Sequence, residues 1–418
     1  MPSAQANENF LYRKPNTENW LPLNEGSLRV ILGLDSTDEI PKEKLNTLAE
    51  NKRAVQDLLS SALQLPNLVF FAGSGTSLGE VGGPSMWDLW NLSMCTKSDA
   101  SDGDPDLGKL TKEAESVCRQ VHYEERDNPN IEHFLSQCDS YLQFQSDSTI
   151  EDFVRNVKGV ILNACTSFLN RPDSNISSYS GLLQKLARRR VRDPRLKVFT
   201  TNYDMCFETA ASELGMMVVD GFSYTRNRRF DGKYFNYDVV RRDGDGQEFV
   251  EGIFQLFKLH GSVSWNREEK NIRETASPEP ENVALIYPAK GKYQQAFMQP
   301  HLELFSRFIE ALRLPNNCLL MSGFGFNDDH LSEPVLSAIK SNPSLKLIIA
   351  DFKAKEHIEN NDAIGSSQYW LELAQLADQG YDVHFINCSF SEFMEIIPNL
   401  RALSPAEQLA KAIKTVGK

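Results

Sequence analysis

The stretch Leu196–Asp204, LKVFTTNYD, decides how the rest of this chain is expected to fold. Its residues through Phe199 are mostly apolar and include strong β-formers, which predicts a short buried strand. The tip Thr200–Asp204 follows where that strand would leave its sheet, and the next segment, DMCFETAASEL, has the pattern of a helix. A strand, a polar tip and a helix in this order place ligand-binding groups at the carboxyl edge of an open α/β sheet. Asn202 in the tip carries both a donor and an acceptor, which suits hydroxyl groups such as a ribose diol.

A second stretch, Asn67–Ser77 or NLVFFAGSGTS, has the same order of features. Leu68–Phe71 predicts a short apolar strand, and a turn of small residues follows it. Glycines let a backbone approach a pyrophosphate, and free N–H groups near a helix start bind its charge. The turn lacks the GK[ST] ending of a P-loop and is weak evidence by itself. The candidate phosphate-binding residues are Ala72, Gly73, Ser74, Gly75, Thr76 and Ser77.

A third stretch, Phe254–Ser262 or FQLFKLHGS, predicts an apolar strand that ends at His260. A lone histidine is usually structural. This one lies at a strand tip beside a glycine, just as Asn202 lies at another strand tip. The shared position favours a catalytic role for His260 over a structural one.

Two more predicted strands end in polar or small residues. The segment Cys318–His330, CLLMSGFGFNDDH, predicts a strand, a glycine turn with Ser322 and Gly323, and the start of a helix at Asp328 and Asp329. The segment LKLIIADF ends a further strand at Asp351. An acid at such a strand end can accept hydrogen bonds from both hydroxyls of an adenosine ribose.

The alternation of strands and helices predicts an α/β fold, with a Rossmann-like, doubly wound and mainly parallel sheet and a large helical insertion. The insertion is assigned because Ile131–Phe144 and Ile150–Leu169 carry apolar residues at spacings of three and four. The expected parts are an N-terminal helical segment (1–66), a sheet domain (67–95 and 191–390), the helical insertion (96–190) and C-terminal helices (391–418).

Composition excludes several classes of function. The 418-residue chain has a formal net charge of −13, which argues against nucleic acid or an anionic membrane as a direct partner of this chain alone. No apolar run approaches the length of a transmembrane helix. Residues 1–20 are polar and lack the apolar core of a signal peptide, so a cytoplasmic location is expected.

Cysteines and histidines give no pattern of metal ligands. The seven cysteines form no CxxC pair and their number is odd, so neither a zinc module nor a disulfide framework is expected. They are expected to be small apolar fillers in a reduced protein. The seven histidines show no HExxH or comparable spacing. The chain is therefore expected to work without a metal.

Taken in order, these strand tips resemble the motifs of the sirtuin family. Gly73–Ser77, GSGTS, resembles the sirtuin GAGxS phosphate loop, and Thr200–Asp204, TTNYD, resembles its TQNxD motif. Lys258–Ser262, KLHGS, resembles its HG motif with the catalytic histidine, and SGFGF resembles its later glycine loop. Asp351 occupies the place of the ribose-binding strand end. The ordered set is more specific than any one motif.

The sequence departs from deacetylase-type sirtuins at one point. Their four-cysteine zinc module follows the HG motif, whereas the corresponding interval here, Trp265–Leu285, contains no cysteine. The acyl-lysine cleft that this module helps to build is therefore in doubt. TTNYD with KLHGS and GFGFND resembles instead the bacterial sirtuin-like proteins of anti-phage defence, which hydrolyse NAD. A freestanding chain of this size resembles those that assemble with a HerA-like ATPase.

The resemblance implies an NAD hydrolase that cleaves NAD to nicotinamide and ADP-ribose, depletes an infected cell of NAD and is gated by assembly. Asn202 would orient the ribose and the attacking water, and His260, with a reference pKa of about 6.5, would act as the base. Asp204 would position nicotinamide or, as an equal alternative, cap the following helix. The NAD-binding candidates are Ala72, Gly73, Ser74, Gly75, Thr76, Ser77, Thr201, Asp204, Ser322, Gly323 and Asp351.

Two other functions stay open at this point. One is an NAD-dependent deacylase or ADP-ribosyltransferase, and the other is a non-catalytic subunit that senses NAD or ADP-ribose. The presence of both Asn202 and His260 favours chemistry over binding alone. The helical patterns before Arg190 and after Ser389 exceed what one sheet needs for its two faces. We therefore expect a homo-oligomer whose packing controls access to the NAD cleft.

Overall fold

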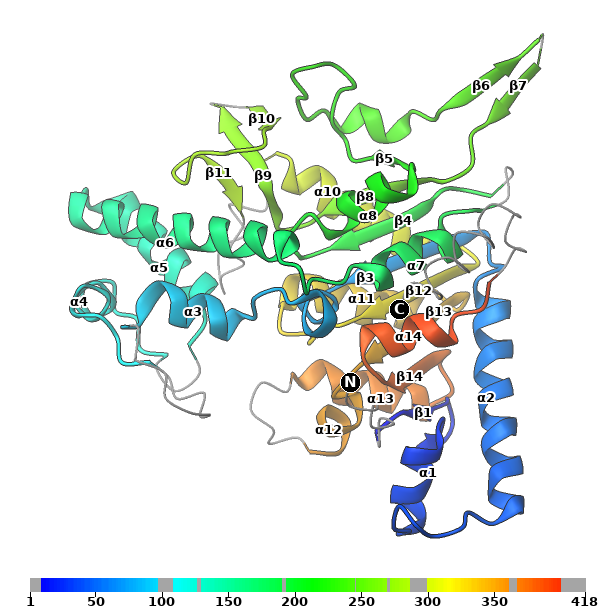
Figure 1. The fold of residues 1–418 in the computed structure, drawn as a ribbon. Helices are drawn as coiled ribbons and strands as arrows, with labels where there is room; N and C mark the ends of the chain where they lie inside the picture. Colours follow the sequence, from blue (N-terminus) through cyan, green and yellow to red (C-terminus); the bar gives the residue numbers. More distant parts are fainter. Residues whose placement is uncertain are drawn as a thin grey trace.

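The computed structural model describes residues 9–96, 108–125, 129–189, 193–244, 246–268, 271–285, 299–360 and 367–399. A nine-stranded sheet in the order β2-β1-β14-β13-β12-β3-β4-β8-β5 forms its centre (Figure 1). The strands are β1 (Leu11–Arg13), β2 (Leu21–Pro22), β3 (Asn67–Ala72), β4 (Leu196–Thr200), β5 (Met217–Val219), β8 (Ile253–Lys258), β12 (Asn317–Ser322), β13 (Leu345–Asp351) and β14 (Val383–Asn387). Every neighbouring pair from β14 to β5 is parallel, and only the pairs that involve β1 are antiparallel. The predicted α/β fold with a mainly parallel sheet is confirmed.

The strands that carry the predicted motifs end in register at one edge of the sheet. Ser322 of β12 lies opposite Ala350 of β13 on one side and Ala72 of β3 on the other. Ala72 in turn lies opposite Thr200 of β4, and Thr200 lies opposite Lys258 of β8. Because parallel strands share a direction, the tips that follow these residues gather at the carboxyl edge, where open α/β sheets bind their ligands.

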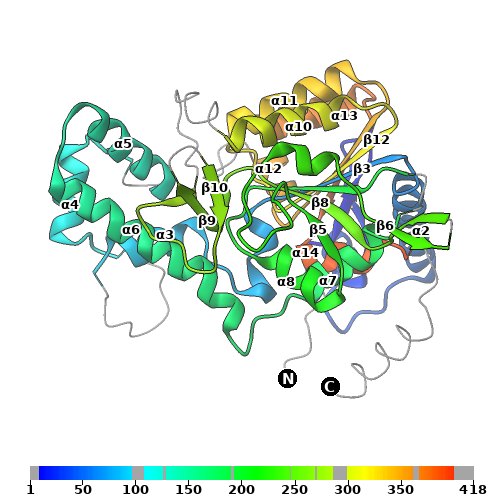
Figure 2. The same ribbon diagram turned by 90° about the horizontal axis from the view of Figure 1, so that it is seen from above.

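Side chains that alternate along the strands fill two hydrophobic cores, one on each face of the sheet. Phe199 and Phe257 belong to the first core, and Val198 and Leu256 belong to the second. Both faces are covered, which explains the nearly continuous apolar runs in these strands. Figure 2 shows the two helical layers on opposite sides of the sheet. The first layer is α10 (His301–Arg313), α11 (Asp329–Ser341), α12 (Ala354–Glu359) and α13 (Gln368–Asp378), and the second is α2 (Lys42–Ala62), α7 (Ser177–Leu186), α8 (Cys206–Leu214) and α14 (Phe390–Ile396).

The N-terminal segment adds to the edge of the sheet. Besides α1 (Glu25–Leu32) and α2, it supplies the two short strands β1 and β2, and β1 pairs with β14. The hydroxyl of Tyr12 on β1 lies 2.9 Å from Nδ1 of His384 on β14, in a buried hydrogen bond. The prediction of a helical N-terminal segment (1–66) therefore missed the two strands β1 and β2. The division of the chain into domains stays a prediction. The C-terminal helices expected after residue 399 lie outside the described residues.

The predicted helical insertion is present and has a core of its own. Its helices are α4 (Lys112–Gln120), α5 (Ile131–Phe144) and α6 (Ser148–Ser167), which project to one side of the sheet in Figures 1 and 2. The helix α3 (Met86–Met94), which the sequence placed in the sheet domain, packs with them. Trp90 and Phe134 are buried in this core, and Tyr203 from the tip after β4 packs into it. The helix α7, which the sequence placed in the insertion, instead covers the sheet. The insertion thus lies directly beside the LKVFTTNYD tip.

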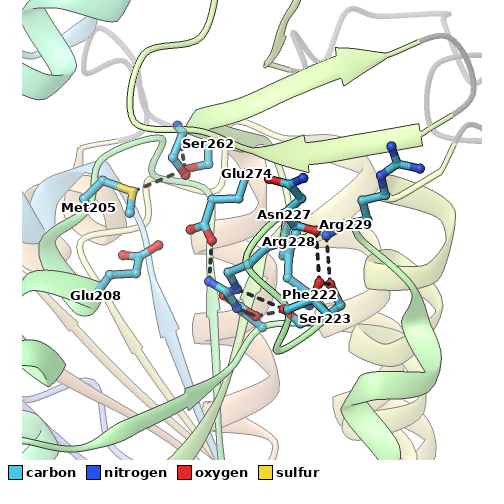
Figure 3. Close-up of polar contacts among 12 residues, drawn as sticks. Met205, Glu208, Phe222, Ser223, Asn227, Arg228, Arg229, Ser262 and Glu274 are labelled. Carbon is cyan, nitrogen blue, oxygen red and sulfur yellow. Dashed lines mark hydrogen bonds and ion pairs between the residues drawn. The ribbon is translucent and has the colours of Figure 1, made fainter.

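A separate, smaller sheet has the strand order β10-β9-β11, and its strand β9 follows β8 in the chain. It consists of β9 (Gly261–Glu268), β10 (Asn271–Glu274) and β11 (Val283–Leu285), and a separate hairpin is formed by β6 (Val240–Asp243) and β7 (Gly246–Phe249). The guanidinium of Arg228 forms an ion pair with Glu274 on β10 (Figure 3). It also pairs with Asp220, at 2.6 Å. At the start of β9, Ser262 donates to the sulfur of Met205 at 3.5 Å. These contacts hold β9, which begins directly after His260, against the tip after β4.

Candidate functional site

A cavity of about 690 Å³ lies at the carboxyl edge of the sheet, between the strand tips and the helical insertion. Its volume is within the range of about 300–1,000 Å³ that is usual for small-molecule sites. The predicted residues that line it are Ser74, Ser77, Thr201, Asn202, Asp204 and His260. The wall also contains residues that the sequence did not single out for binding, chiefly Glu124, Glu125, Asn130, Glu132 and His133 from the insertion, Tyr203 from the tip after β4, and Phe324, Asn327 and Asp328 after β12.

The glycine turns after β3 and after β12 pack against each other and are joined by hydrogen bonds. Gly73 N–H donates to the carbonyl of Ser322 and Gly75 N–H to the carbonyl of Gly323, both at 2.9 Å. A Cβ on Gly73 would lie 2.3 Å from the oxygen of Gly323, and Gly323 itself has φ +62°. The predicted residues Ala72, Gly73, Gly75, Thr76, Ser322 and Gly323 do not line the cavity. Gly73, Gly75 and Gly323 instead bring the two turns together, because only glycine permits backbones this close.

Gly73→Ala is expected to reduce the free energy of unfolding by about 3 kcal/mol, at the upper end of the cost of overpacking. The added methyl group meets backbone atoms of Gly323, which cannot move away as a flexible side chain could. Chemical denaturation followed by circular dichroism would measure the change. Gly181→Ala is the matched control, because a Cβ there meets nothing within 4 Å and alanine is favoured in a helix. A Gly73→Ala protein as stable as the control would contradict the packing assigned to these turns.

Asn202 is the centre of a hydrogen-bond network that joins the tips after β3 and β4 to the helix α7. Its Nδ2 donates to Thr76 Oγ1 at 3.1 Å and to Ser77 Oγ at 2.8 Å. Ser77 donates to Asp204 at 2.6 Å, and the Tyr179 hydroxyl donates to Thr76 at 2.9 Å. These contacts fix the orientation of the amide, so that Oδ1 is buried and has no hydrogen-bond partner among the described residues. A buried, unpaired acceptor costs about 1–3 kcal/mol, which marks Oδ1 as a position for a ligand hydroxyl or a water.

Asp204 has the local contacts of a helix cap and also lines the cavity. Its Oδ1 accepts a hydrogen bond from the Cys206 N–H at the start of α8, at 3.0 Å, while Oδ2 accepts the bond from Ser77. The N-cap residue of α8 is Met205, so Asp204 binds the first amide of the helix from the position before the cap. A role toward nicotinamide stays a prediction.

A buried lysine, to which the sequence analysis gave no role, binds the backbone of the tip after β4. Lys258, at the end of β8, donates to the backbone carbonyls of Tyr203 and Asp204. Its ammonium also pairs with Glu208 of α8 at 3.0 Å, and the lysine side chain is only 3% exposed. One feature of the sequence could have indicated this role, namely that Lys258 ends an otherwise apolar strand. A buried charge in such a strand needs partners.

His260 is buried at the end of β8, and its ring faces the cavity. Its Nε2 lies 3.6 Å from Oδ2 of Asp328 and has no hydrogen-bond partner among the described residues. The ring stacks on His330 with centroids 5.7 Å apart. Burial lowers the pKa of His260 to about 3, so the imidazole is neutral at physiological pH. A neutral imidazole with a free nitrogen can accept a proton, but at this pKa it is a weaker base than the reference value of about 6.5 implies.

Two acids of the cavity were missed as site residues. Glu132, at the start of α5, is buried and accepts a hydrogen bond from the Tyr203 hydroxyl. Burial, and then the charge of Asp328, raises the pKa of Glu132 to about 8. Burial also raises the pKa of Asp328 to about 6, against the effect of His330. The sequence analysis placed Asp328 only at the start of a helix and Glu132 within an insertion helix, and no pattern indicated that either meets the strand tips.

Asp351 ends β13 at the same edge of the sheet but does not line the cavity. Its Oδ1 accepts a hydrogen bond from the Lys353 N–H at 2.8 Å, and burial raises the pKa of the carboxyl. Ser322 Oγ, at the end of the neighbouring strand β12, is buried without a hydrogen-bond partner among the described residues. The adenosine-binding role of these two residues stays a prediction.

The described part of the chain contains neither a disulfide nor a metal-binding cluster. All seven cysteines are free and six of them are buried. No three His, Cys, Asp or Glu side chains in the described ranges are arranged to hold a metal ion. No helix in those ranges combines the length and the apolar character that a membrane crossing requires.

Comparison with known proteins finds a family match for part of the chain. Residues 196–372 match the model of the SIR2-like domain, and the predicted resemblance to sirtuins is supported at that level. No curated protein matches the chain. Solved structures that it resembles include a mutant Sir2 homologue bound to 2′-O-acetyl ADP ribose, with 13% identity, a TM-score of 0.40, and coverage of 82% of this chain and 96% of that one. Another is a Sir2 homologue–NAD complex, with 12% identity, a TM-score of 0.39, and coverage of 82% and 92%.

Proposed function

We propose that this protein, through its SIR2-like domain, hydrolyses NAD to nicotinamide and ADP-ribose. The observation that carries the proposal is a pair of buried polar atoms without partners among the described residues, Asn202 Oδ1 and His260 Nε2. Both residues line the cavity of about 690 Å³ above the glycine turns. A buried acceptor and a buried neutral imidazole at one sheet edge suit a ligand that brings hydroxyl groups and a water to be activated.

The bond to be broken joins the nicotinamide nitrogen to ribose C1′. Its electron pair leaves with nicotinamide, which becomes neutral, while positive charge develops on the ribose. Asn202 would hold a ribose hydroxyl and the attacking water through Oδ1, since Nδ2 is already engaged. His260 would take the proton of that water as its oxygen bonds to C1′. Nicotinamide, ADP-ribose and one proton are the products.

The pyrophosphate would lie near the first glycine turn. Ser74 and Ser77 face the cavity there, and the turn is a 3-10 helix, η1 (Ser74–Thr76), that follows β3 directly. Small residues and backbone N–H groups in such a turn are the usual partners of phosphate oxygens.

The direct test is nicotinamide release from NAD by the purified protein, followed by chromatography, with Asn202→Ala as the inactive control. Release that depends on Asn202 supports the hydrolase. Binding of NAD without any release would favour the non-catalytic sensor. Release that needs an acetylated peptide would favour a deacylase. The absence of cysteine from Trp265–Leu285 argues against that last outcome, because the family's zinc module has no ligands there.

Asp351→Ala is expected to weaken NAD binding about tenfold while slowing the bound step much less, because its proposed contact with the adenosine ribose is remote from C1′. KM and kcat for nicotinamide release would separate the two effects. Asp382→Ala is a control from the amino-terminal side of the sheet, where this acid pairs with Lys346 at 2.7 Å. An unchanged KM in Asp351→Ala would remove Asp351 from the binding site.

We further propose that the protein is an effector of anti-phage defence and forms a homo-oligomer, with a HerA-like ATPase as a partner. The support is the resemblance of its motifs and the helical insertion, which stands beside the cavity and whose α5 ends in an 87% exposed Phe144. Phe144→Glu is expected to lower both the mass measured by light scattering and the rate of NAD cleavage. Val30→Glu, at an exposed apolar residue of α1, is the control. A monomeric parent protein with full activity would contradict gating by assembly.

A further inference from the structure

The helical insertion places a carboxyl group inside the cavity. Glu132 is the second residue of α5, after the N-cap residue Asn130 and Ile131, and it lines the cavity with only 7% of its surface exposed. The hydroxyl of Tyr203, the residue directly after Asn202, donates a hydrogen bond to it. The insertion thus touches the predicted catalytic tip through a specific polar contact as well as through its apolar core.

A second carboxyl group reaches the cavity from the other side. Asp328 stands at the N-cap position of α11 but makes no side-chain capping hydrogen bond, so its carboxylate is not used to complete the helix. Its Oδ2 instead lies 3.6 Å from Nε2 of His260. Its charge acts on Glu132, which shows that the two carboxyl groups share one electrostatic environment.

Neither carboxyl group has a strong cation of its own. No lysine or arginine within the described ranges forms an ion pair with Glu132 or Asp328. The nearest basic groups are three imidazoles, His260, His133 and His330. His133 already pairs with Glu125 at 3.0 Å. Buried acids are normally paired or neutralised, so two of them that line a cavity without a fixed cation suit a ligand that carries positive charge.

The reaction proposed above supplies such a ligand. The nicotinamide ring of NAD is a cation, and as the bond to C1′ breaks, that charge passes to the ribose. NADH lacks the ring charge, and ADP-ribose lacks the ring. Asn202 and His260 with their unpaired atoms mark where C1′ would lie, and Asp328 is adjacent to His260.

We propose that Glu132 and Asp328 form an acid pair that receives the positive charge of the nicotinamide ribose and thereby selects the oxidised dinucleotide over uncharged analogues. This inference rests on the proposed function and names the groups that set its substrate class. Fixed negative charge placed where positive charge develops also lowers the barrier to cleavage, because the cavity walls exclude much of the solvent that would screen it.

The pair also predicts how selectivity depends on pH. Raised pKa values of about 6 for Asp328 and about 8 for Glu132 mean that the pair loses its protons as pH rises between these values. Negative charge then increases, and affinity for the cation should increase with it. The other titratable groups that act on the pair are His133 on α5, Cys165 on α6, Asp329 and His330 on α11, His260 after β8 and the Tyr203 hydroxyl after β4. His260 stays neutral in this interval because burial keeps its pKa near 3.

The test compares ligands and does not depend on turnover. Calorimetry on the full-length Asn202→Ala protein would give dissociation constants for NAD, NADH and ADP-ribose. At a pH above 8, where both acids have lost their protons, adding Glu132→Gln or Asp328→Asn should weaken NAD binding about tenfold, the equivalent of one unit of pKa in interaction energy, and leave NADH and ADP-ribose within about twofold. Both substitutions keep the size of the side chain. Glu151→Gln is the matched control, since it removes the same charge at an exposed position of α6, outside the cavity wall and screened by solvent.

Each outcome separates this inference from the proposed function. Equal weakening of all three ligands would overturn it in favour of a structural role for the acids, and an unchanged preference for NAD would also overturn it. Failure of the parent protein to bind NAD and ADP-ribose would instead overturn the proposed function. If the acid variants do not fold, the parent still gives an answer. The ratio of NAD to ADP-ribose affinity should rise between pH 6 and pH 8, and a flat ratio would overturn the acid pair.

Discussion

Asn202→Ala is expected to lower the rate of NAD cleavage by about 10²–10³-fold, the effect of removing one fixed group that acts on the reacting centre. The alanine keeps the backbone but loses Oδ1, the acceptor that has no hydrogen-bond partner among the described residues. It also frees Ser77 and Thr76 from one donor each. Nicotinamide release at saturating NAD would measure the loss.

The fold should survive this change, although at some cost. Ser77 retains Tyr179 and Asp204 as partners, and Thr76 retains Tyr179, so no polar group is left wholly unpaired. We expect a loss of stability of about 1–3 kcal/mol. Asn360→Ala, at an exposed position after α12, is the control for changing an asparagine. An Asn202→Ala protein with near-normal turnover at saturating NAD would remove this residue from the mechanism.

His260→Ala is expected to slow cleavage by about 10²–10⁴-fold, the usual contribution of a general base. The imidazole is neutral over the physiological range because burial lowers its pKa to about 3. Protonation of His260 should therefore not limit the parent enzyme between pH 5 and pH 8. The pH dependence seen there should come from Asp328 and Glu132, and cleavage should become faster as these acids lose their protons.

Two observations would contradict this assignment of His260. One is a cleavage rate of the parent protein that decreases as pH drops through about 6.5, together with a rate in His260→Ala that does not depend on pH. That result would mean that His260 titrates far above the pKa of about 3 set by burial. The other is normal turnover in the variant. His122→Asn is the control, because His122 is exposed, has φ +57°, and asparagine tolerates that backbone conformation. Circular dichroism would verify that His260→Ala is folded.

Several parts of the site could be predicted from local sequence alone. Apolar runs that end in TTNYD, KLHGS and the glycine turns specify buried parallel strands, and parallel strands must end at the same edge. That constraint was enough to bring Asn202 and His260 together on the wall of one cavity. It was also enough to place Ser322 and Gly323 against the first glycine turn, where only residues without a Cβ permit the observed contacts.

The sequence alone was less informative about the ends of the sheet and about Asp351. β1 and β2 are only three and two residues long, too short for a periodic signal, and β1 is fixed by its pairing with β14. Asp351 lies at the expected strand end but outside the cavity wall, because its carboxylate accepts a hydrogen bond from the following turn. A strand-end rule predicts the edge on which a residue lies and not the direction of its side chain.

Only the tertiary structure decided which acids belong to the site. A glutamate in the first turn of a helix ordinarily faces solvent and complements the helix dipole, so the pattern of α5 gave no reason to choose Glu132. Its burial follows from the docking of the insertion against Tyr203, a contact between residues 71 positions apart in sequence. Lys258 and Asp328 likewise acquired their partners from other strands and helices. The sequence by itself determined the strands, the turns and the shared edge, because these depend on neighbouring residues. The electrostatics of the cavity depended on which distant side chains the packing removes from water.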